Sequence, residues 1–288
     1  MPTHRLLLGL VLVVLAAGAV GVGAMTAAST ATTEADRAAD AAASAAERTA
    51  AQADRDAAAA VIAAEAARIA ALRPVPAQAS APLELPAAPA LSLDDPASLW
   101  VVVNKARPLD GGSTYVPSDL VIVPVAHTFS PLLRQEASAA VVALFDAAQA
   151  EAGLTLASNS AYRAYSVQQR VYGSIVAASG QAYADTTSAR PGHSEHQTGL
   201  SLDIGAVSGR CSLNACFAET AEGQWLAGNA WRFGFELRYP DGMEAVTGFN
   251  FEPWHYRYLG VDLATTLHES GVTTLEEHFG LAAAPDYR

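Results

Sequence analysis

The sequence predicts an α+β domain with a mainly antiparallel sheet and flanking helices, preceded by an N-terminal apolar helix and an Ala/Pro-rich spacer. Two observations predict this class. Beyond about residue 97, helical and extended patterns follow one another without the regular strand–helix–strand order of a parallel sheet. Every tryptophan, tyrosine and phenylalanine of the 288-residue chain also lies beyond residue 97, so the packed core belongs there.

Residues 1–26 contain an uncharged apolar stretch from Leu6 to Met25. A secretory signal has an apolar core of about 7–15 residues, whereas a membrane-spanning helix needs about 20, so this segment fits either a signal peptide or a signal anchor. Arg5 before the stretch and acidic residues after it place the N-terminus in the cytoplasm. We therefore expect an extracytoplasmic protein, either membrane-anchored through one pass or secreted after cleavage.

Residues 27–72 are dominated by alanine, which has the highest helix propensity, so this segment is predicted to be a helical stalk. Its large apolar residues are too few for a heptad repeat, which argues against a coiled coil. Residues 73–96 are rich in proline and alanine and are predicted to form an extended linker without a core. The working domain is then residues 97–288.

Within this domain, short apolar runs predict extended segments at residues 99–103, 119–125, 154–161, 200–204, 235–239 and 251–258. A helix is predicted over residues 133–148, where apolar side chains recur at three- and four-residue steps and Gly153 follows. Further helices are predicted over residues 166–178 and 220–233 and in two short segments after residue 258, with a turn at residues 240–242.

Charge and cysteine content exclude several functions. Acidic residues outnumber basic ones by 29 to 17, the net charge is −12, and Lys105 is the only lysine. Nucleic-acid binding needs Lys and Arg to displace counterions from phosphates, so no nucleic-acid partner is expected. Two cysteines are too few for a four-cysteine zinc module. Outside the cytoplasm, Cys211 and Cys216 are expected to form a disulfide that closes a short loop, with reduced cysteines as the alternative.

Histidines and carboxylates concentrate in two segments, residues 191–205 and 251–258. In chain order these side chains are His193, Glu195, His196, Asp203, Glu252 and His255. A catalytic zinc uses three nitrogen or oxygen ligands and keeps a fourth position open for water, and His196, Asp203 and His255 would supply that set. Glu252 would be the general base. On spacing alone, two surface loops of ordinary polar residues remain the alternative.

Three motifs carry a family resemblance. Gly192-His-Ser-Glu-His-Gln-Thr-Gly199 with Asp203, and Glu252-Pro-Trp-His-Tyr-Arg-Tyr258, resemble the VanY-type D-alanyl-D-alanine carboxypeptidases. These belong to a wider metallopeptidase group with the lysostaphin-type endopeptidases and the hedgehog domain. Ser160-Ala-Tyr-Arg-Ala-Tyr-Ser-Val-Gln168 is similar to the family's Ser-Gly-Tyr-Arg-Ser-Tyr-x-x-Gln, with alanine in place of the Gly and of the first Ser that follows the Arg. The resemblance covers residues 99–260.

The resemblance implies a fold with a zinc site and one zinc ion per chain, bound by His196, Asp203 and His255. It also implies that Glu252 is the catalytic base and that Arg163 polarises the scissile carbonyl or stabilises the oxyanion. The implied substrate-binding residues are Gln168, Ser194 and Ser160. The implied activity is removal of the terminal D-Ala from a peptidoglycan stem peptide, or a precursor, ending in D-Ala-D-Ala.

Two alternative functions remain open. An L,D-carboxypeptidase or a stem-peptide endopeptidase would use the same zinc site with different pocket loops. A non-catalytic cell-wall-binding module would keep the fold without the chemistry, but its sequence sign would be a missing base or ligand, and none is missing here. The N-terminal apolar segment would add a membrane partner if it is not cleaved.

Several neighbouring residues have competing interpretations. Glu195 is a rival base, but adjacent residues in a strand point apart, so it is expected to orient a loop or a ligand. His193 is expected to be a loop histidine rather than a fourth ligand. Glu252 and His255 would face opposite sides of a regular strand, so we predict a strand end or bulge at Pro253. The candidates for binding the substrate carboxylate are Arg190, Arg210, Arg238 and Arg257, and those for purely structural histidines are His127, His268 and His278.

Overall fold

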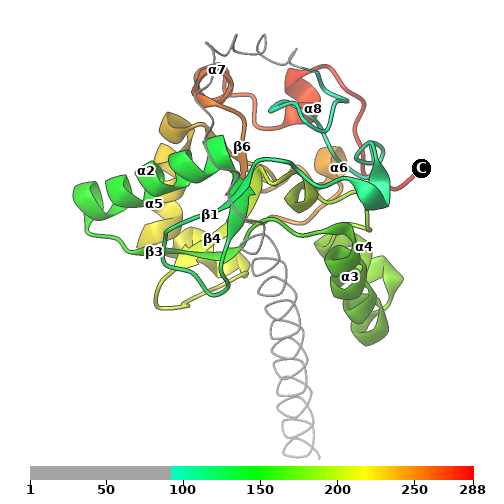
Figure 1. Cartoon of the computed structure of the whole chain (residues 1–288), viewed down its shortest axis with the longest axis horizontal. Helices are drawn as coiled ribbons and strands as arrows, with labels where there is room; N and C mark the ends of the chain where they lie inside the picture. Colours follow the sequence, from blue (N-terminus) through cyan, green and yellow to red (C-terminus); the bar gives the residue numbers. More distant parts are fainter. Residues whose placement is uncertain (1–91) are drawn as a thin grey trace, which may run out of the picture. The chain divides into compact units, whose positions relative to one another are not determined.

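The computed structural model describes residues 92–288 (Figure 1). The predicted apolar segment, the stalk and most of the linker fall on residues 1–91 and lie outside the described residues. Within residues 92–288, no helix has the length and apolar character needed to cross a membrane.

A four-stranded antiparallel sheet forms the centre of the domain. Its order is β3 (Leu156–Ser160), β4 (Ser201–Ala206), β6 (His255–Tyr258) and β5 (Phe235–Leu237). All three pairings are antiparallel, as predicted for this fold class. Every residue of β4 is buried, and the strand lies between β3 and β6 in the sheet.

The register of this sheet places three polar residues side by side. Asp203 in β4 pairs with His255 in β6 on one side and with Ser160 in β3 on the other. Leu202 and Ile204 alternate with Asp203 and enter the main hydrophobic core. The pleat therefore sends the apolar side chains of β4 to one face and the carboxylate to the other.

A separate antiparallel pair consists of β1 (Leu120–Ile122) and β2 (Leu132–Arg134). It leads into α2 (Gln135–Ala152), the predicted amphipathic helix, which ends at Gly153 with a left-handed φ of 68°. The side chains that α2 buries in the core are those of Ala137, Val141, Leu144, Phe145 and Ala148.

The other α-helices are α3 (Tyr165–Ser179), α4 (Gln181–Thr187), α5 (Ala221–Asn229), α6 (Glu244–Thr247), α7 (Val261–Ser270) and α8 (Leu275–His278). Short 3-10 turns are η1 (Gly112–Thr114), η2 (Glu195–Thr198), η3 (Ala215–Glu219) and η4 (Ala230–Phe233). Figure 1 shows α2 and α5 together on one side of the domain and α3 and α4 together on the other.

Two predicted elements were wrong. Residues 99–103 were expected to be a strand but form a buried loop, in which the carbonyls of Leu99 and Val101 accept hydrogen bonds from Arg257 at 2.9 and 2.8 Å. The run is apolar because this loop is buried, not because it pairs as a strand. The helix expected over residues 220–233 divides into α5 and η4, because the backbone of Asn229 leaves the helical region at φ −131°.

The strand end predicted at Pro253 is confirmed. Residues 253 and 254 form a turn, and β6 begins only at His255. The backbone N–H of His255 donates to the carbonyl of Glu252 at 3.0 Å, which closes this turn. Glu252 and His255 are thereby freed from strand alternation and lie on the same side.

Candidate active site

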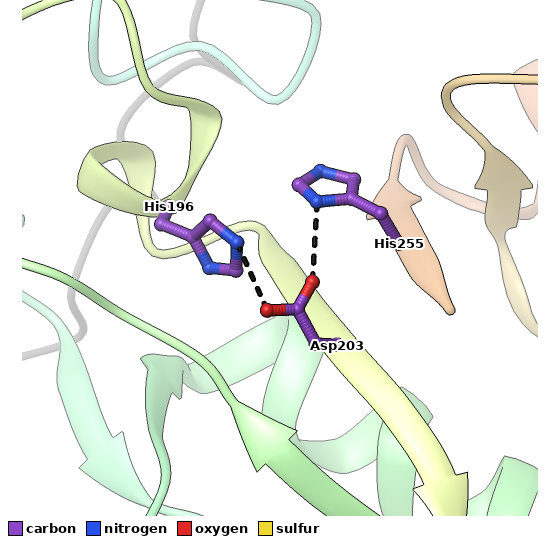
Figure 2. A group of neighbouring side chains, drawn as sticks. All are labelled: His196, Asp203 and His255. Carbon is purple, nitrogen blue, oxygen red and sulfur yellow. Dashed lines mark ion pairs between the residues drawn. The ribbon is translucent and has the colours of Figure 1, made fainter. Parts of the chain in front are cut away.

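The structure brings His196, Asp203 and His255 together from three different elements (Figure 2). His196 lies in η2, Asp203 in the central strand β4, and His255 at the start of β6. One ligand atom from each lies within 4.8 Å of the others, and all three residues are buried. Asp203 Oδ2 is 3.4 Å from His196 Nε2, and Asp203 Oδ1 is 3.2 Å from His255 Nδ1.

A backbone carbonyl just after β3 fixes the orientation of His196. Its Nδ1 lies 2.7 Å from the carbonyl oxygen of Ala161, so this nitrogen carries the proton and Nε2 faces the other two side chains. The turn η2 that carries His196 ends at Gly199 with φ 68°. This left-handed φ favours glycine, and a Cβ at position 199 would also lie 2.9 Å from Leu120 Cδ2, so that any other residue would displace this side chain of β1.

The donor atoms of this cluster fit a zinc ion. Asp203 Oδ1 is buried and has no hydrogen-bond partner among the described residues, although His255 Nδ1 is only 3.2 Å away. A cation bound between this carboxylate oxygen and the facing imidazole nitrogen would satisfy both atoms. Two imidazole nitrogens and one carboxylate oxygen also form a known three-ligand set of catalytic zinc, with the fourth position open.

Glu252 adds a second carboxylate beside the cluster. Its Oε2 lies 3.7 Å from His255 Nδ1, and its backbone N–H donates to the carbonyl of Tyr239 at 3.0 Å. Burial raises the pKa of Glu252 to about 8, and the negative charge of Asp203 contributes in the same direction. A carboxyl group with this pKa can exchange a proton near neutral pH.

Arg163 provides the positive charge of the site. Its Nη2 lies 3.7 Å from Asp203 Oδ2. Nη1 donates to Gln168 Oε1 at 2.8 Å and Nη2 to Ser160 Oγ at 3.2 Å. Gln168 in turn donates to the carbonyl of Ala189 at 2.6 Å. Two of the predicted substrate-binding residues, Gln168 and Ser160, therefore hold the guanidinium in place.

A cavity of about 450 Å³ opens over these groups. The polar side chains that line it include those of Arg163, Gln168, Ser194, His196, Asp203, Glu252 and His255. Its volume lies within the range of small-ligand sites. The predicted metal ligands, base and arginine thus line one cavity, together with Ser194. Ser160 does not line this cavity, but it accepts a hydrogen bond from Arg163, which does.

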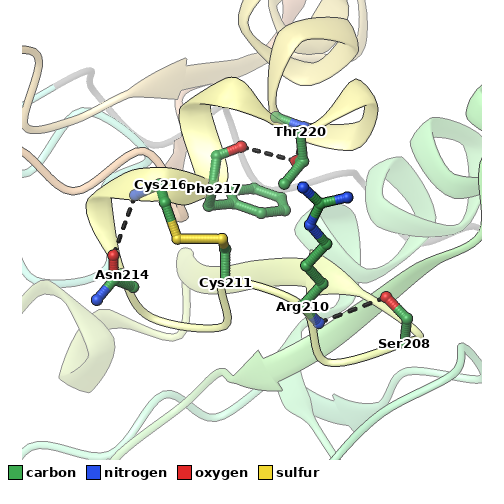
Figure 3. Close-up of a disulfide and its surroundings, with 8 residues drawn as sticks. Ser208, Arg210, Cys211, Asn214, Cys216, Phe217 and Thr220 are labelled. Atoms are coloured by element: carbon green, nitrogen blue, oxygen red, sulfur yellow. Dashed lines mark hydrogen bonds between the residues drawn. A yellow bond between two sulfur atoms is a disulfide. The ribbon is translucent and has the colours of Figure 1, made fainter.

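Part of the cavity wall comes from a disulfide loop. Cys211 and Cys216 form a disulfide (Figure 3). Leu213, Asn214 and Ala215, which lie between them, line the cavity. The side chain of Asn214 accepts a hydrogen bond from the backbone N–H of Cys216 at 3.1 Å. The loop is therefore cross-linked by a covalent bond and a hydrogen bond at the same place.

Three of the four arginines suggested for carboxylate binding are engaged elsewhere. The side chains of Arg238 and Arg257 have no exposed surface and pair with Glu195, and Arg190 forms a two-pronged pair with Asp185. Arg210 is exposed and does not line the cavity. Among the described residues, Arg163 is the arginine that faces the cavity.

The remaining histidines lie outside the metal cluster among the described residues. His193 contacts the carbonyl of Asn104 at 2.9 Å. Of the other three, His127 contacts the carbonyl of Val125, His268 stacks on Trp231, and His278 packs edge-on against Phe279. Sequence reasoning missed Tyr239, whose ring packs against that of His255 with centroids 4.8 Å apart. It also missed the pairing of Glu195 with two buried arginines, since no spacing signal links residues so far apart in the chain.

This geometry defines the class of protein. An antiparallel α+β domain that gathers two imidazoles, a carboxylate, a separate glutamate and an arginine in one cavity is organised as a zinc metallopeptidase.

Comparison with known proteins gives the family. The VanY family model, described as D-alanyl-D-alanine carboxypeptidase, matches residues 130–261. The chain is 40% identical over 193 residues to the putative carboxypeptidase YodJ of Bacillus subtilis (strain 168), covering 65% of this chain and 69% of YodJ. It is 39% identical over 144 residues to a D-alanyl-D-alanine carboxypeptidase of Enterococcus faecalis, covering 47% of this chain and 51% of that relative.

Two solved structures are similar to this chain in both fold and sequence. The LdcB LD-carboxypeptidase superimposes with a TM-score of 0.60 at 40% identity, covering 65% of this chain and 88% of LdcB. A VanY D,D-pentapeptidase from a VanB-type resistance cassette, solved in complex with Zn(II), gives 0.52 at 33% identity, covering 62% and 97%. The chain belongs to the VanY family and is a zinc carboxypeptidase, not a non-catalytic wall-binding module.

Proposed function

We propose that this chain is a zinc-dependent D-alanyl-D-alanine carboxypeptidase that hydrolyses the terminal D-Ala of peptidoglycan stem peptides. The observation that carries the proposal is the convergence of His196, Asp203 and His255 with Glu252 and Arg163 in one cavity. The VanY D,D-pentapeptidase to which the chain is similar was solved with Zn(II). His196 Nε2, the Asp203 carboxylate and His255 Nδ1 are the atoms that would hold the ion.

Zinc bound there would supply Lewis acidity, which lowers the pKa of water toward 7 and polarises a carbonyl. Glu252 is placed to accept the proton of the attacking water and to pass it to the leaving D-Ala amine. Without the ion, burial raises the pKa of Glu252 to about 8, and a cation held by the neighbouring ligands would lower that pKa and favour the carboxylate form that a base requires. Its Oε2, 3.7 Å from His255 Nδ1, lies beside the proposed ligands.

Arg163 is placed to stabilise the negative charge that develops on the scissile carbonyl oxygen. Its hydrogen bonds to Gln168 and Ser160 hold the guanidinium before the reaction, so little reorganisation is needed as the charge forms. Ser194 is 4% exposed and lines the same cavity, where its hydroxyl can hydrogen-bond the substrate. Gln168 and Ser160 contribute to substrate binding through Arg163.

We also propose an extracytoplasmic location, with the domain either anchored through the N-terminal apolar segment or released after cleavage. The disulfide between Cys211 and Cys216 supports this location, because such bonds persist in oxidising compartments. The stem peptide or its precursor is the partner expected there.

A second candidate activity is that of an L,D-carboxypeptidase. It is supported by the similarity to LdcB, whose structure gives a TM-score of 0.60 at 40% identity. Both activities would use the same zinc site. They differ in the configuration of the residue before the scissile bond, which the cavity wall rather than the metal ligands would distinguish.

One experiment separates these possibilities. The full-length chain, loaded with zinc, is incubated with a pentapeptide stem ending in D-Ala-D-Ala and with a tetrapeptide stem ending in a single D-Ala. Mass spectrometry follows the products, with a chelator-treated sample as control. Loss of one alanine from the pentapeptide, abolished by chelator, supports the proposal. Cleavage of the tetrapeptide alone selects the L,D-activity, an internal cut selects an endopeptidase, and no cleavage with zinc bound refutes all three.

A further inference from the structure

Glu195 faces the metal cluster from a direction that the proposed chemistry does not use. It is the first residue of η2, next to His196, and its side chain has no exposed surface. Its Oε2 lies 3.5 Å from His255 Nε2, which is buried and has no hydrogen-bond partner among the described residues, whereas His255 Nδ1 faces Asp203 at 3.2 Å. The imidazole of His255 is therefore placed between two carboxylates, one at each nitrogen.

Buried arginines fix the position of the Glu195 carboxylate. Its Oε1 accepts hydrogen bonds from Arg238 Nε at 2.9 Å and from Arg257 Nη1 at 3.0 Å. Ser201 Oγ donates to Oε2 at 3.3 Å. Two buried guanidinium groups therefore bind the same carboxylate oxygen, which requires Glu195 to be an anion.

A second carboxylate completes the cluster and balances its charge. Arg238 binds Glu276 through two hydrogen bonds, at 3.0 and 2.7 Å, and Asn104 donates to Glu276 at 2.8 Å. Two carboxylates and two guanidinium groups then share a site with almost no exposed surface. Such a cluster is stable only when each charge is paired and hydrogen-bonded, so its geometry is rigid.

We propose that Glu195 is a positioning residue that fixes the ring orientation and the proton of His255, so that Nδ1 is presented to the metal. A neutral imidazole has one donor and one acceptor nitrogen, and if Nδ1 is the atom that holds the ion beside Asp203, Nε2 is the donor that faces Glu195. The proton therefore resides on Nε2, and the lone pair of Nδ1 is free for coordination. Metal-bound histidines are commonly oriented in this way by a carboxylate. The inference rests on the ligand set proposed above.

The test measures zinc affinity rather than turnover. The metal-free full-length chain is titrated with zinc against a chromogenic chelator, for wild type, Glu195→Gln and Glu195→Asp. Gln keeps the shape and removes the charge, whereas Asp keeps the charge balance with the arginines but withdraws the carboxylate from His255. Both are expected to weaken zinc binding by about 10- to 100-fold. Thermal unfolding of the metal-free proteins reports whether each variant is folded.

Glu276→Gln is the matched control, because it removes the same charge from the same cluster without touching His255. It is expected to lower the thermal stability of the metal-free chain while zinc affinity stays within about twofold of wild type. Wild-type zinc affinity in folded Glu195→Gln and Glu195→Asp would overturn the inference. So would an equal loss in Glu276→Gln, which would indicate a structural effect of the cluster. If Glu195→Gln does not fold, Glu195→Asp decides.

A fourth variant separates this inference from the proposed ligand set. His255→Ala should lose zinc binding altogether. If His255→Ala instead binds zinc with wild-type affinity, the ligand set is wrong. If His255→Ala loses zinc while both Glu195 variants retain it, the ligand set stands and the positioning role of Glu195 is refuted.

Discussion

Replacing Glu252 by glutamine is the most direct test of the proposed chemistry. The substitution keeps the volume of the side chain but removes its ability to accept a proton from water. The contacts that place this residue belong to the backbone, since its N–H donates to Tyr239 and its carbonyl accepts from His255, both at 3.0 Å. The fold and the three proposed ligands are therefore expected to survive.

The expected loss follows from the role assigned to the carboxylate. Removal of a general base lowers turnover by about 10²–10⁴-fold. At about 1.4 kcal/mol per tenfold, this corresponds to about 2.8–5.6 kcal/mol of transition-state stabilisation. The assay is steady-state release of D-Ala from the pentapeptide stem, with zinc content determined on the same preparation by elemental analysis. Zinc is expected at one ion per chain, as in wild type.

Glu236→Gln is the matched control for Glu252→Gln. Burial raises the pKa of Glu236 to about 8 as well, but this residue lies in β5 and lines a different cavity. Its substitution is expected to change turnover by less than about twofold. Near-wild-type turnover in Glu252→Gln with zinc bound would refute the assignment of the base. An equal loss in Glu236→Gln would show that the assay reports buried charge in general.

Three further predictions concern other parts of the domain. Arg163→Lys loses the planar fork that the neighbouring side chains hold, so kcat should fall by about 10²–10³-fold with zinc content unchanged; steady-state kinetics with full activity would contradict this. Burial raises the pKa of Glu276, but the charge of Arg238 and the hydrogen bonds to the carboxylate together have the larger effect, and the net result is a lowered pKa. The stability that Glu276 contributes is therefore present above its unfolded-state pKa and is lost as the pH falls through its folded-state pKa. Thermal unfolding followed into acid should show a smaller loss for Glu276→Gln than for wild type, and parallel curves would disprove it. Replacing Cys211 and Cys216 by serine should raise KM for the stem peptide with zinc content unchanged, because the loop they close lines the cavity; an unchanged KM would exclude the loop from substrate binding.

Local signals in the sequence were sufficient for several elements. The recurrence of apolar residues and the following Gly153 predicted α2, because both the buried face and the left-handed end of a helix leave local patterns. Pro253 predicted the start of β6, because proline cannot donate to a ladder. In both cases the physical cause lies within a few residues of the pattern.

The parts that could not be predicted depend on contacts between distant segments. Nothing in the local sequence shows that Asp203 and His255 are cross-strand neighbours; residue type and the family resemblance grouped them as metal ligands, but neither gave their pairing in the sheet. The apolar run at residues 99–103 resembles a strand, but its carbonyls bind the side chain of Arg257 instead of a neighbouring strand. The overall composition, which is acidic, likewise gives no indication that some arginines are buried.

The pairing of Asp203 with His255 has a consequence for how such a protein can diversify. The hydrogen bonds between β4 and β6 hold these two residues side by side, however the chain travels from one strand to the other. The connection from β4 to α5, residues 207–220, carries the disulfide loop and part of the cavity wall, but none of the proposed ligands and not the base. Insertions or exchanges in that segment can reshape what the cavity admits without moving the two neighbours. The residues that select the substrate can therefore change without changing the residues that hold the metal.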